Sequence, residues 1–130
     1  MKKILVIDDD QFFCKTLGEA LPKDKYALVT AEDGEMGLSK LKSEKPDLVV
    51  LDLMMPKLDG TEFMKKLQAV PELNKTPVLI SSNLSSMKKI SDLMALGAVG
   101  YVIKSDESMA SIVQDIERIL GEEEAPKQQS

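Results

Sequence analysis

The sequence has 130 residues, of which 43% are hydrophobic and 30% are charged, and its formal net charge is −5. This composition indicates one folded domain rather than a disordered chain, and the acidic balance argues against broad nucleic-acid binding. No apolar run approaches the roughly 20 residues of a membrane span, and the single cysteine, Cys14, has no disulfide partner in the chain, so we expect a cytoplasmic protein.

Short apolar runs alternate with helix-period patterns along the chain, and acidic residues follow the first run at once, which favours a strand over a signal peptide. Five strands are expected, at residues 4–7, 26–30, 48–51, 78–80 and 99–103. Apolar residues spaced by three and four follow each strand and predict five helices, the first of them containing Phe13, Leu17 and Leu21. Residues 122–130 lack this periodicity, so we expect a domain at residues 1–121 and a frayed tail.

Several helix ends carry their own sequence signals. Asp59 is followed three residues later by Glu62, which resembles a capping box at the start of the third helix. Asp10 is expected to serve only as a cap or surface acid at the first helix. Gly97 and Gly121 stand where helix C-caps are usual, so they are expected to end the fourth and fifth helices.

Strands that alternate with helices predict a parallel sheet covered on both faces, with right-handed crossovers. The carboxyl ends of all the strands then gather along one edge, where ligands bind in open α/β sheets. Polar residues stand at four of these ends: Asp8, Asp9 and Asp10 at the first strand, Asp52 at the third, Ser81 and Ser82 at the fourth, and Lys104 at the fifth. We expect carboxylates, a hydroxyl and an ammonium group to converge in one site.

The residue types at this edge predict a particular chemistry. Carboxylates held close together repel one another unless a cation joins them, and Mg²⁺ takes oxygen ligands while keeping several waters. Mg²⁺ and a lysine also neutralise phosphoryl oxygens, and a carboxylate can attack phosphorus to form an aspartyl phosphate. The set therefore predicts a metal-assisted aspartate phosphorylation site, in which Ser82 hydrogen-bonds a phosphoryl oxygen.

The chain resembles a receiver domain of the two-component response regulators, in its single-domain, chemotaxis-regulator-like form. The resemblance rests on four motifs in register, which are ILVIDDD, DLVVLDLMMPKLDG, PVLISSN and GYVIK, and it covers about residues 2 to 120. It implies an α/β fold, namely a flavodoxin-like (βα)5 three-layer sandwich whose five-stranded parallel sheet has the order 2-1-3-4-5.

The resemblance also implies a role for each site residue, with Mg²⁺ as the cofactor. Asp52 would be the phosphoacceptor. Lys104 would contact the phosphoryl group, Ser82 would be the switch hydroxyl, and Tyr101 would be the aromatic residue that turns with it. The implied metal ligands are Asp8 through water, Asp9 and Asp52 directly, and the backbone carbonyl of Met54.

The implied partners follow from the same resemblance. Because the sequence contains no histidine, the phosphohistidine donor has to be another protein, either a histidine kinase or a histidine phosphotransfer protein. We expect it to dock near the first helix and the loop after Lys104. An output protein would read the face formed by the fourth helix, fifth strand and fifth helix, and we expect a monomer or a weak phosphorylation-dependent dimer. The chain would be a signalling switch rather than an enzyme, without direct binding to nucleic acid.

Two residues depart from the family pattern. Ser105 stands where proline usually follows the site lysine, and a cis bond before a residue other than proline costs about 3 kcal/mol. The loop after Lys104 is therefore expected to be rearranged. Asn83 stands where a small residue usually follows the switch serine, and its larger side chain would narrow the access to Asp52.

Three alternatives belong to other functional classes. Asp8 and Asp10 fit the D-x-D spacing of haloacid-dehalogenase-type phosphatases, but Gln11-Phe12 and the missing acidic Gly-Asp motif do not. A receiver-like module that is never phosphorylated remains open because of Asn83 and Ser105, against the complete acidic, hydroxyl and lysine set. A flavodoxin is weaker still, since acids replace the turn that would hold a flavin phosphate.

Overall fold

The computed structural model describes residues 1–53, 59–82 and 87–121. In these ranges five strands alternate with five helices, in the order β1 (Lys2–Ile7), α1 (Gln11–Ala20), β2 (Tyr26–Ala31), α2 (Gly34–Glu44), β3 (Leu48–Asp52), α3 (Gly60–Gln68), β4 (Val78–Ser82), α4 (Met87–Ala95), β5 (Gly100–Ile103) and α5 (Met109–Leu120). All paired strands are parallel, and their order in the sheet is β2-β1-β3-β4-β5. The predicted flavodoxin-like fold is confirmed.

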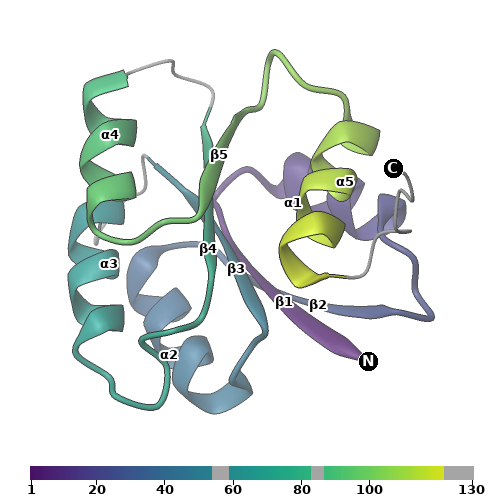
Figure 1. Ribbon diagram of the computed structural model, residues 1–130. Helices are drawn as coiled ribbons and strands as arrows, with labels where there is room; N and C mark the ends of the chain where they lie inside the picture. The colour runs from purple at the N-terminus through teal and green to yellow at the C-terminus, as the bar shows by residue number, and fades with distance from the viewer. Residues whose placement is uncertain (54–58, 83–86, 122–130) are drawn as a thin grey trace.

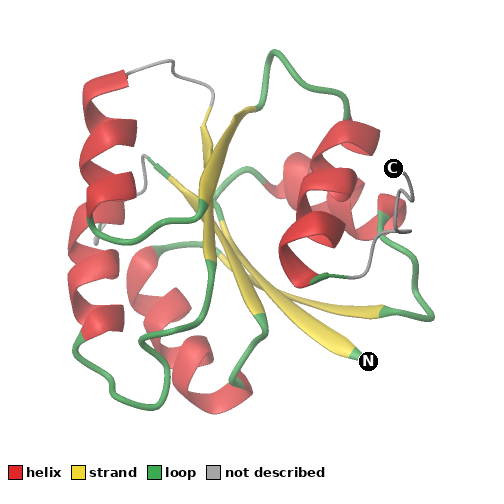
Figure 2. Ribbon diagram, viewed as in Figure 1, coloured by secondary structure: helices red, strands yellow, loops and turns green. Residues whose placement is uncertain are grey.

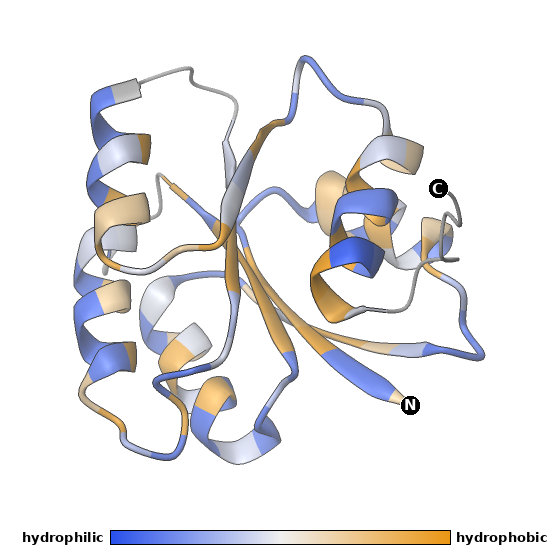
Figure 3. Ribbon diagram, in the orientation of Figure 1, coloured by the Kyte–Doolittle hydropathy of each residue, from blue (hydrophilic) through white to orange (hydrophobic). Residues whose placement is uncertain are grey.

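The sheet lies between two helix layers (Figures 1 and 2). Helices α1 and α5 cover one side, here named the α1–α5 face, and α2, α3 and α4 cover the other, here named the α2–α4 face. Successive residues of a strand point to opposite faces, so Val50 belongs to the core under α1 and α5, while Val49 belongs to the core under α2–α4. Hydrophobic residues concentrate on the strands (Figure 3). Every residue of β3 and β4 is buried, as expected for central strands of a parallel sheet.

The starts of four helices follow the same physical rule. The side chain before each helix accepts a hydrogen bond from the backbone N–H three residues further on, and these capping residues are Asp10, Asp33, Asp59 and Ser108. Such a cap contributes about 1 kcal/mol to stability. The capping roles predicted for Asp10 and Asp59 are confirmed.

The helix and strand ends differ in how well local sequence predicts them. Gly97 and Gly121 both have positive φ, at 115° and 72°, just after α4 and α5 end, as predicted. Helix α2 instead has Lys45 as its C-cap, with a positive φ of 48° and no glycine at that position to signal it. Strand β1 begins two residues earlier than predicted, since Lys2 pairs with Tyr26 although it is not apolar.

The described helices are short, and α5 is the longest of them at 12 residues. None of the helices in the described ranges combines the length and apolar character that crossing a membrane requires. Residues 122–130, for which the sequence predicts a frayed tail, lie outside the described residues.

Candidate functional site

The strand order brings the predicted site residues to one edge of the sheet. Asp8 follows the end of β1, Asp52 is the last residue of β3, and Lys104 follows the end of β5. Backbone hydrogen bonds continue past the strands: the N–H of Asp8 donates to Ala31 O at 2.9 Å, and the N–H of Lys104 donates to Ser82 O at 2.7 Å. The side chains therefore start from backbone that the neighbouring strands hold in place.

Three carboxylates form a cluster at this edge. Asp8, Asp9 and Asp52 each offer an oxygen, and these oxygens all lie within 4.8 Å of one another. Asp8 and Asp52 are buried, with 2% and 8% of their surfaces exposed, whereas Asp9 is exposed. The cluster therefore opens toward solvent on one side, and its oxygens suit a hard divalent cation that keeps some of its waters. The predicted acidic group able to hold a metal is confirmed, while Met54 lies outside the described residues.

Lys104 is buried against this cluster. Its Nζ lies 2.5 Å from Oδ2 of Asp8, and the two side chains are 7% and 0% exposed. The other carboxylate oxygen of Asp8 accepts a hydrogen bond from the N–H of Asp10 at 2.9 Å. Both oxygens of the buried Asp8 are thus partnered, which offsets the cost of removing its charge from water.

An aromatic ring also contacts this lysine. The Lys104 ammonium lies 4.3 Å from the centre of the Phe13 ring, within the range of a cation–π interaction. The sequence predicted Phe13 only as a core residue of the first helix, because its spacing from Leu17 fits a helix face, and its contact with a lysine 91 positions later has no local signal. Ser105, which replaces the usual proline, is exposed and does not keep Lys104 from the site.

The two serines at the end of β4 face opposite sides of the sheet. By strand alternation Ser82 shares the α2–α4 face with Ile80, and Ser81 shares the α1–α5 face with Leu79. Both serines are buried. Ser81 pairs in register with Asp52, yet its hydroxyl finds no hydrogen-bond partner among the described residues.

Tyr101 lies on the same face as Ser82. On β5 it alternates with Val102 and shares the α2–α4 face with Ile103, which pairs in register with Ser82. Its exposed fraction is 42%. The structure thus brings Asp8, Asp9, Asp52 and Lys104 together, and it groups the two predicted switch residues, Ser82 and Tyr101, on the other face of the sheet. Asn83 lies outside the described residues.

Cys14, in the first turn of α1, lies next to the carboxylate cluster. Its thiol donates to the backbone oxygen of Asp8 at an Sγ–O distance of 3.8 Å. Burial, followed by the nearby charge of Asp8, raises the pKa of the Cys14 thiol from 9.0 to about 11, against a smaller lowering effect of Lys104. The thiol is therefore neutral at ordinary pH, and Cys14 is a buried structural residue.

Comparisons with known proteins agree with this geometry. The family described as the response regulator receiver domain matches residues 4–117. The alkaline phosphatase synthesis transcriptional regulatory protein PhoP of Bacillus subtilis is 41% identical over 103 residues, which are 79% of this chain and 42% of that protein. A protein-glutamate methylesterase/protein-glutamine glutaminase of Oleidesulfovibrio alaskensis is 31% identical over 125 residues, 94% of this chain and 33% of that protein. The chain thus spans less than half the length of these relatives.

Solved structures show the same likeness over nearly their whole length. The chemotaxis response regulator CheY4 of Vibrio cholerae superposes with a TM-score of 0.83 at 27% identity, covering 92% of this chain and 98% of that one. The phosphorylated cyanobacterial phytochrome response regulator RcpA superposes with a TM-score of 0.82 at 29% identity, covering 92% and 93%. The haloacid-dehalogenase and flavodoxin alternatives find no support among these similar proteins.

Proposed function

Because this chain belongs to the response regulator receiver domain family of two-component signalling, we propose that it receives a phosphoryl group on Asp52 from a phosphohistidine of another protein. One observation carries the proposal. Asp52 ends a fully buried strand, yet an oxygen of its carboxylate lies within 4.8 Å of oxygens from Asp8 and Asp9. Lys104 pairs with one of these carboxylates, Asp8, and a divalent cation would offset the repulsion that remains among the three.

The residues support a balanced transfer reaction. An oxygen of the Asp52 carboxylate attacks phosphorus, the phosphorus–nitrogen bond of the donor breaks, and the imidazole leaves with the electron pair and takes up a proton. Asp8, Asp9 and Asp52 would hold Mg²⁺, with the Met54 carbonyl as a further ligand. When bound, this ion neutralises phosphoryl oxygens and the mutual repulsion of the carboxylates.

Lys104 has a second partner to reach in this reaction. In the structure Lys104 pairs with Asp8, and this pairing would weaken if Asp8 shared its charge with a metal ion. The ammonium group would then be able to turn toward a phosphoryl oxygen on Asp52 and keep its contact with the Phe13 ring. The position of the Lys104 ammonium group would thus depend on whether Asp52 is phosphorylated.

Phosphorylation would bias a conformational equilibrium of the α2–α4 face. A phosphoryl group adds up to about two negative charges and three acceptor oxygens, toward which the Ser82 hydroxyl would turn, and Tyr101 would fill the space behind it. The output surface would be formed by α4, β5 and α5, where Met94, Val99 and Tyr101 are large exposed apolar residues. Unchanged chemical shifts around Tyr101 on adding a beryllofluoride phosphate mimic would contradict this.

The partner surface for phosphotransfer is proposed to lie near α1 and the loop after Lys104. Phe12, in the first turn of α1, is 77% exposed, which favours a protein contact there. Since the chain has no histidine, purified protein is expected to incorporate no phosphate from ATP alone. The donor would be a histidine kinase or a histidine phosphotransfer protein, and the chain a monomer or weak phosphorylation-dependent dimer.

The decisive experiment is incubation with acetyl phosphate and Mg²⁺, followed by intact mass measurement. The protein should gain the mass of one phosphoryl group. Chelation of the metal should abolish this gain, and so should the substitution Asp52→Asn. Asp10→Asn is the matched control, because asparagine caps a helix as well as aspartate and Asp10 belongs to the cap of α1. Equal labelling of Asp52→Asn would refute the acceptor assignment, and no labelling of the parent would favour the unphosphorylated interaction module.

A further inference from the structure

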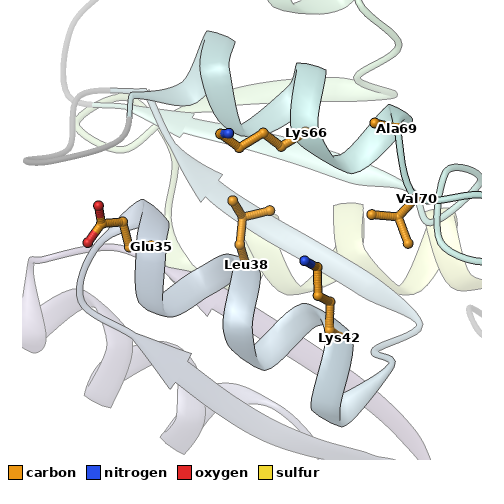
Figure 4. Close-up of a pocket in the computed structure, with 6 residues that line it drawn as sticks. All are labelled: Glu35, Leu38, Lys42, Lys66, Ala69 and Val70. Carbon is orange, nitrogen blue, oxygen red and sulfur yellow. The ribbon is translucent and has the colours of Figure 1, made fainter.

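A groove runs between α2 and α3 on the α2–α4 face (Figure 4). It encloses about 460 Å³, and its lining residues are Glu35, Leu38, Lys42, Lys66, Ala69 and Val70. All of them come from α2, from α3 or from the two residues after α3. Two neighbouring helices therefore form both walls, and within residues 1–53, 59–82 and 87–121 no third element lines the groove.

The floor of the groove is apolar and joins the core. Leu38 and Val70 are partly buried and pack against the hydrophobic cluster under α2–α4. Behind the floor, Gly37 lets α2 lie close to β1, since a Cβ at this position would come within 2.6 Å of Ile7 Cδ1. The floor is thus held by packing, and a ligand would meet an apolar surface that exists before binding.

Each wall of the groove carries one lysine. Lys42 extends from α2 and Lys66 from α3, and both side chains reach toward the space above Leu38 (Figure 4). Over the described ranges neither lysine forms an ion pair, although Glu62 stands one turn before Lys66. Two unpaired ammonium groups on either side of an apolar floor stand out in a chain with a net charge of −5.

We propose that this groove binds an acidic segment of a partner protein in which an aliphatic side chain is flanked by carboxylates. The aliphatic side chain covers Leu38 and Val70, and the carboxylates pair with Lys42 and Lys66. Seven residues separate Glu35 from Lys42, about 10 Å along a helix, a length that an extended peptide spans with about three residues. Glu35, at one end, repels a further acid and so sets the direction of the bound segment.

A peptide suits the groove better than a small molecule, because pockets for small ligands enclose most of the ligand surface and this one has only two walls. The chain's own acidic residues Glu122, Glu123 and Glu124 are a competing occupant. They follow α5, which lies on the opposite face of the sheet (Figure 1), so they would most simply reach the groove of a second copy.

The test is a titration of isotope-labelled full-length protein with the peptide GSEELEEGS, followed by amide chemical shifts. Leu38, Lys42 and Val70 should shift and saturate. The peptides GSQQLQQGS and GSEEGEEGS, which lack the charge or the aliphatic residue, should bind more weakly. The double variant Lys42→Gln with Lys66→Gln should weaken binding about tenfold. The matched control Lys15→Gln with Lys75→Gln, which changes two other exposed lysines, should not.

Several outcomes would overturn the proposal. They are the absence of saturable shifts at Leu38 and Val70 with all three peptides, equal binding by the Lys42→Gln, Lys66→Gln variant, and equal binding of the acidic and glutamine peptides. Groove shifts that depend on protein concentration and vanish when Glu122, Glu123 and Glu124 become glutamine would assign the site to a second copy instead. Asp52→Asn should bind the peptide like the parent, so failure of the phosphoacceptor assignment leaves this test intact.

Discussion

On the α1–α5 face, charged side chains are buried against one another at the carboxyl edge of the sheet. On the α2–α4 face, a serine hydroxyl is buried at the same edge, and the charges of the described ion pair lie at the surface. Asp8 and Lys104 pair below 10% exposure on the first face. On the second, Ser82 is buried, while Lys88 forms its pair with Asp92 in solvent. The two faces thus place their charges in very different dielectric surroundings.

The two faces are therefore suited to different responses to a new charge. Burying an ion pair costs desolvation free energy, and removing either partner strongly destabilises the protein because the other charge stays buried. The α1–α5 face is therefore expected to respond to a new charge by an exchange of ion-pair partners, as proposed for Lys104. A surface pair is screened and contributes little. The α2–α4 face is therefore expected to respond through packing and side-chain rotation. The groove lysines on this face, Lys42 and Lys66, remain available for other molecules.

Removal of the lysine from the buried ion pair should destabilise the protein strongly. Lys104→Met leaves Asp8 buried without its cation, and we expect the free energy of unfolding to fall by about 3–5 kcal/mol in the presence of a chelator. Mg²⁺ should restore part of this loss, because it can neutralise the same carboxylate. Urea denaturation measures both values. Lys88→Met is the control on the other face and should change stability little, so equal losses in the two variants would remove the contrast between the faces.

A second effect concerns alkaline pH on the α1–α5 face. The pKa of Cys14 is raised to about 11 in the folded protein, so the unfolded chain releases the thiol proton first as the pH rises through about 9. Stability from this source is complete below pH 9 and is lost toward pH 11, in total roughly 2–3 kcal/mol at about 1.4 kcal/mol per pKa unit. The measurement is the difference in unfolding free energy between the parent and Cys14→Ala, with chelator, across pH 8 to 11. A difference that is constant with pH would contradict it.

The contact between the Phe13 ring and Lys104 should contribute a smaller amount to the stability of the same face. In a double-mutant cycle that combines Phe13→Leu with Lys104→Met, we expect a coupling energy of about 0.5–2 kcal/mol, the range of cation–π contacts from exposed to desolvated sites. Leucine keeps an apolar side chain in the core and removes the ring face. A cycle of Phe13→Leu with Lys88→Met supplies the control. Coupling that is no larger for Lys104 than for Lys88 would show that the ring only fills space.

Much of this arrangement is predictable from sequence, because strand ends and helix faces have local signals. The apolar run that ends in Asp52 predicts a site at the sheet edge. Asp10 and Asp59 predict the starts of two helices. The pairing of Lys104 with Asp8 is harder to predict, since several carboxylates converge there and only side-chain packing selects one. The groove between α2 and α3 has no signal either, since Lys42 and Lys66 each look like solvated helix residues until the two helices lie side by side.

The smallest expected effect separates the two faces at adjacent residues. Ser81 and Ser82 are both buried. In the part of the chain that the structure describes, the Ser81 hydroxyl on the α1–α5 face has no hydrogen-bond partner, whereas Ser82 does have an interaction partner. A buried hydroxyl without a partner carries its desolvation cost uncompensated. Ser81→Ala should therefore raise the free energy of unfolding by about 1 kcal/mol, and Ser82→Ala should lower it by a similar amount. Thermal unfolding of both variants, without metal, distinguishes the signs. If Ser81→Ala destabilises the protein as much as Ser82→Ala does, then the hydroxyl beside Asp52 is satisfied in solution, and a water molecule between β4 and α5 becomes the physical explanation to test.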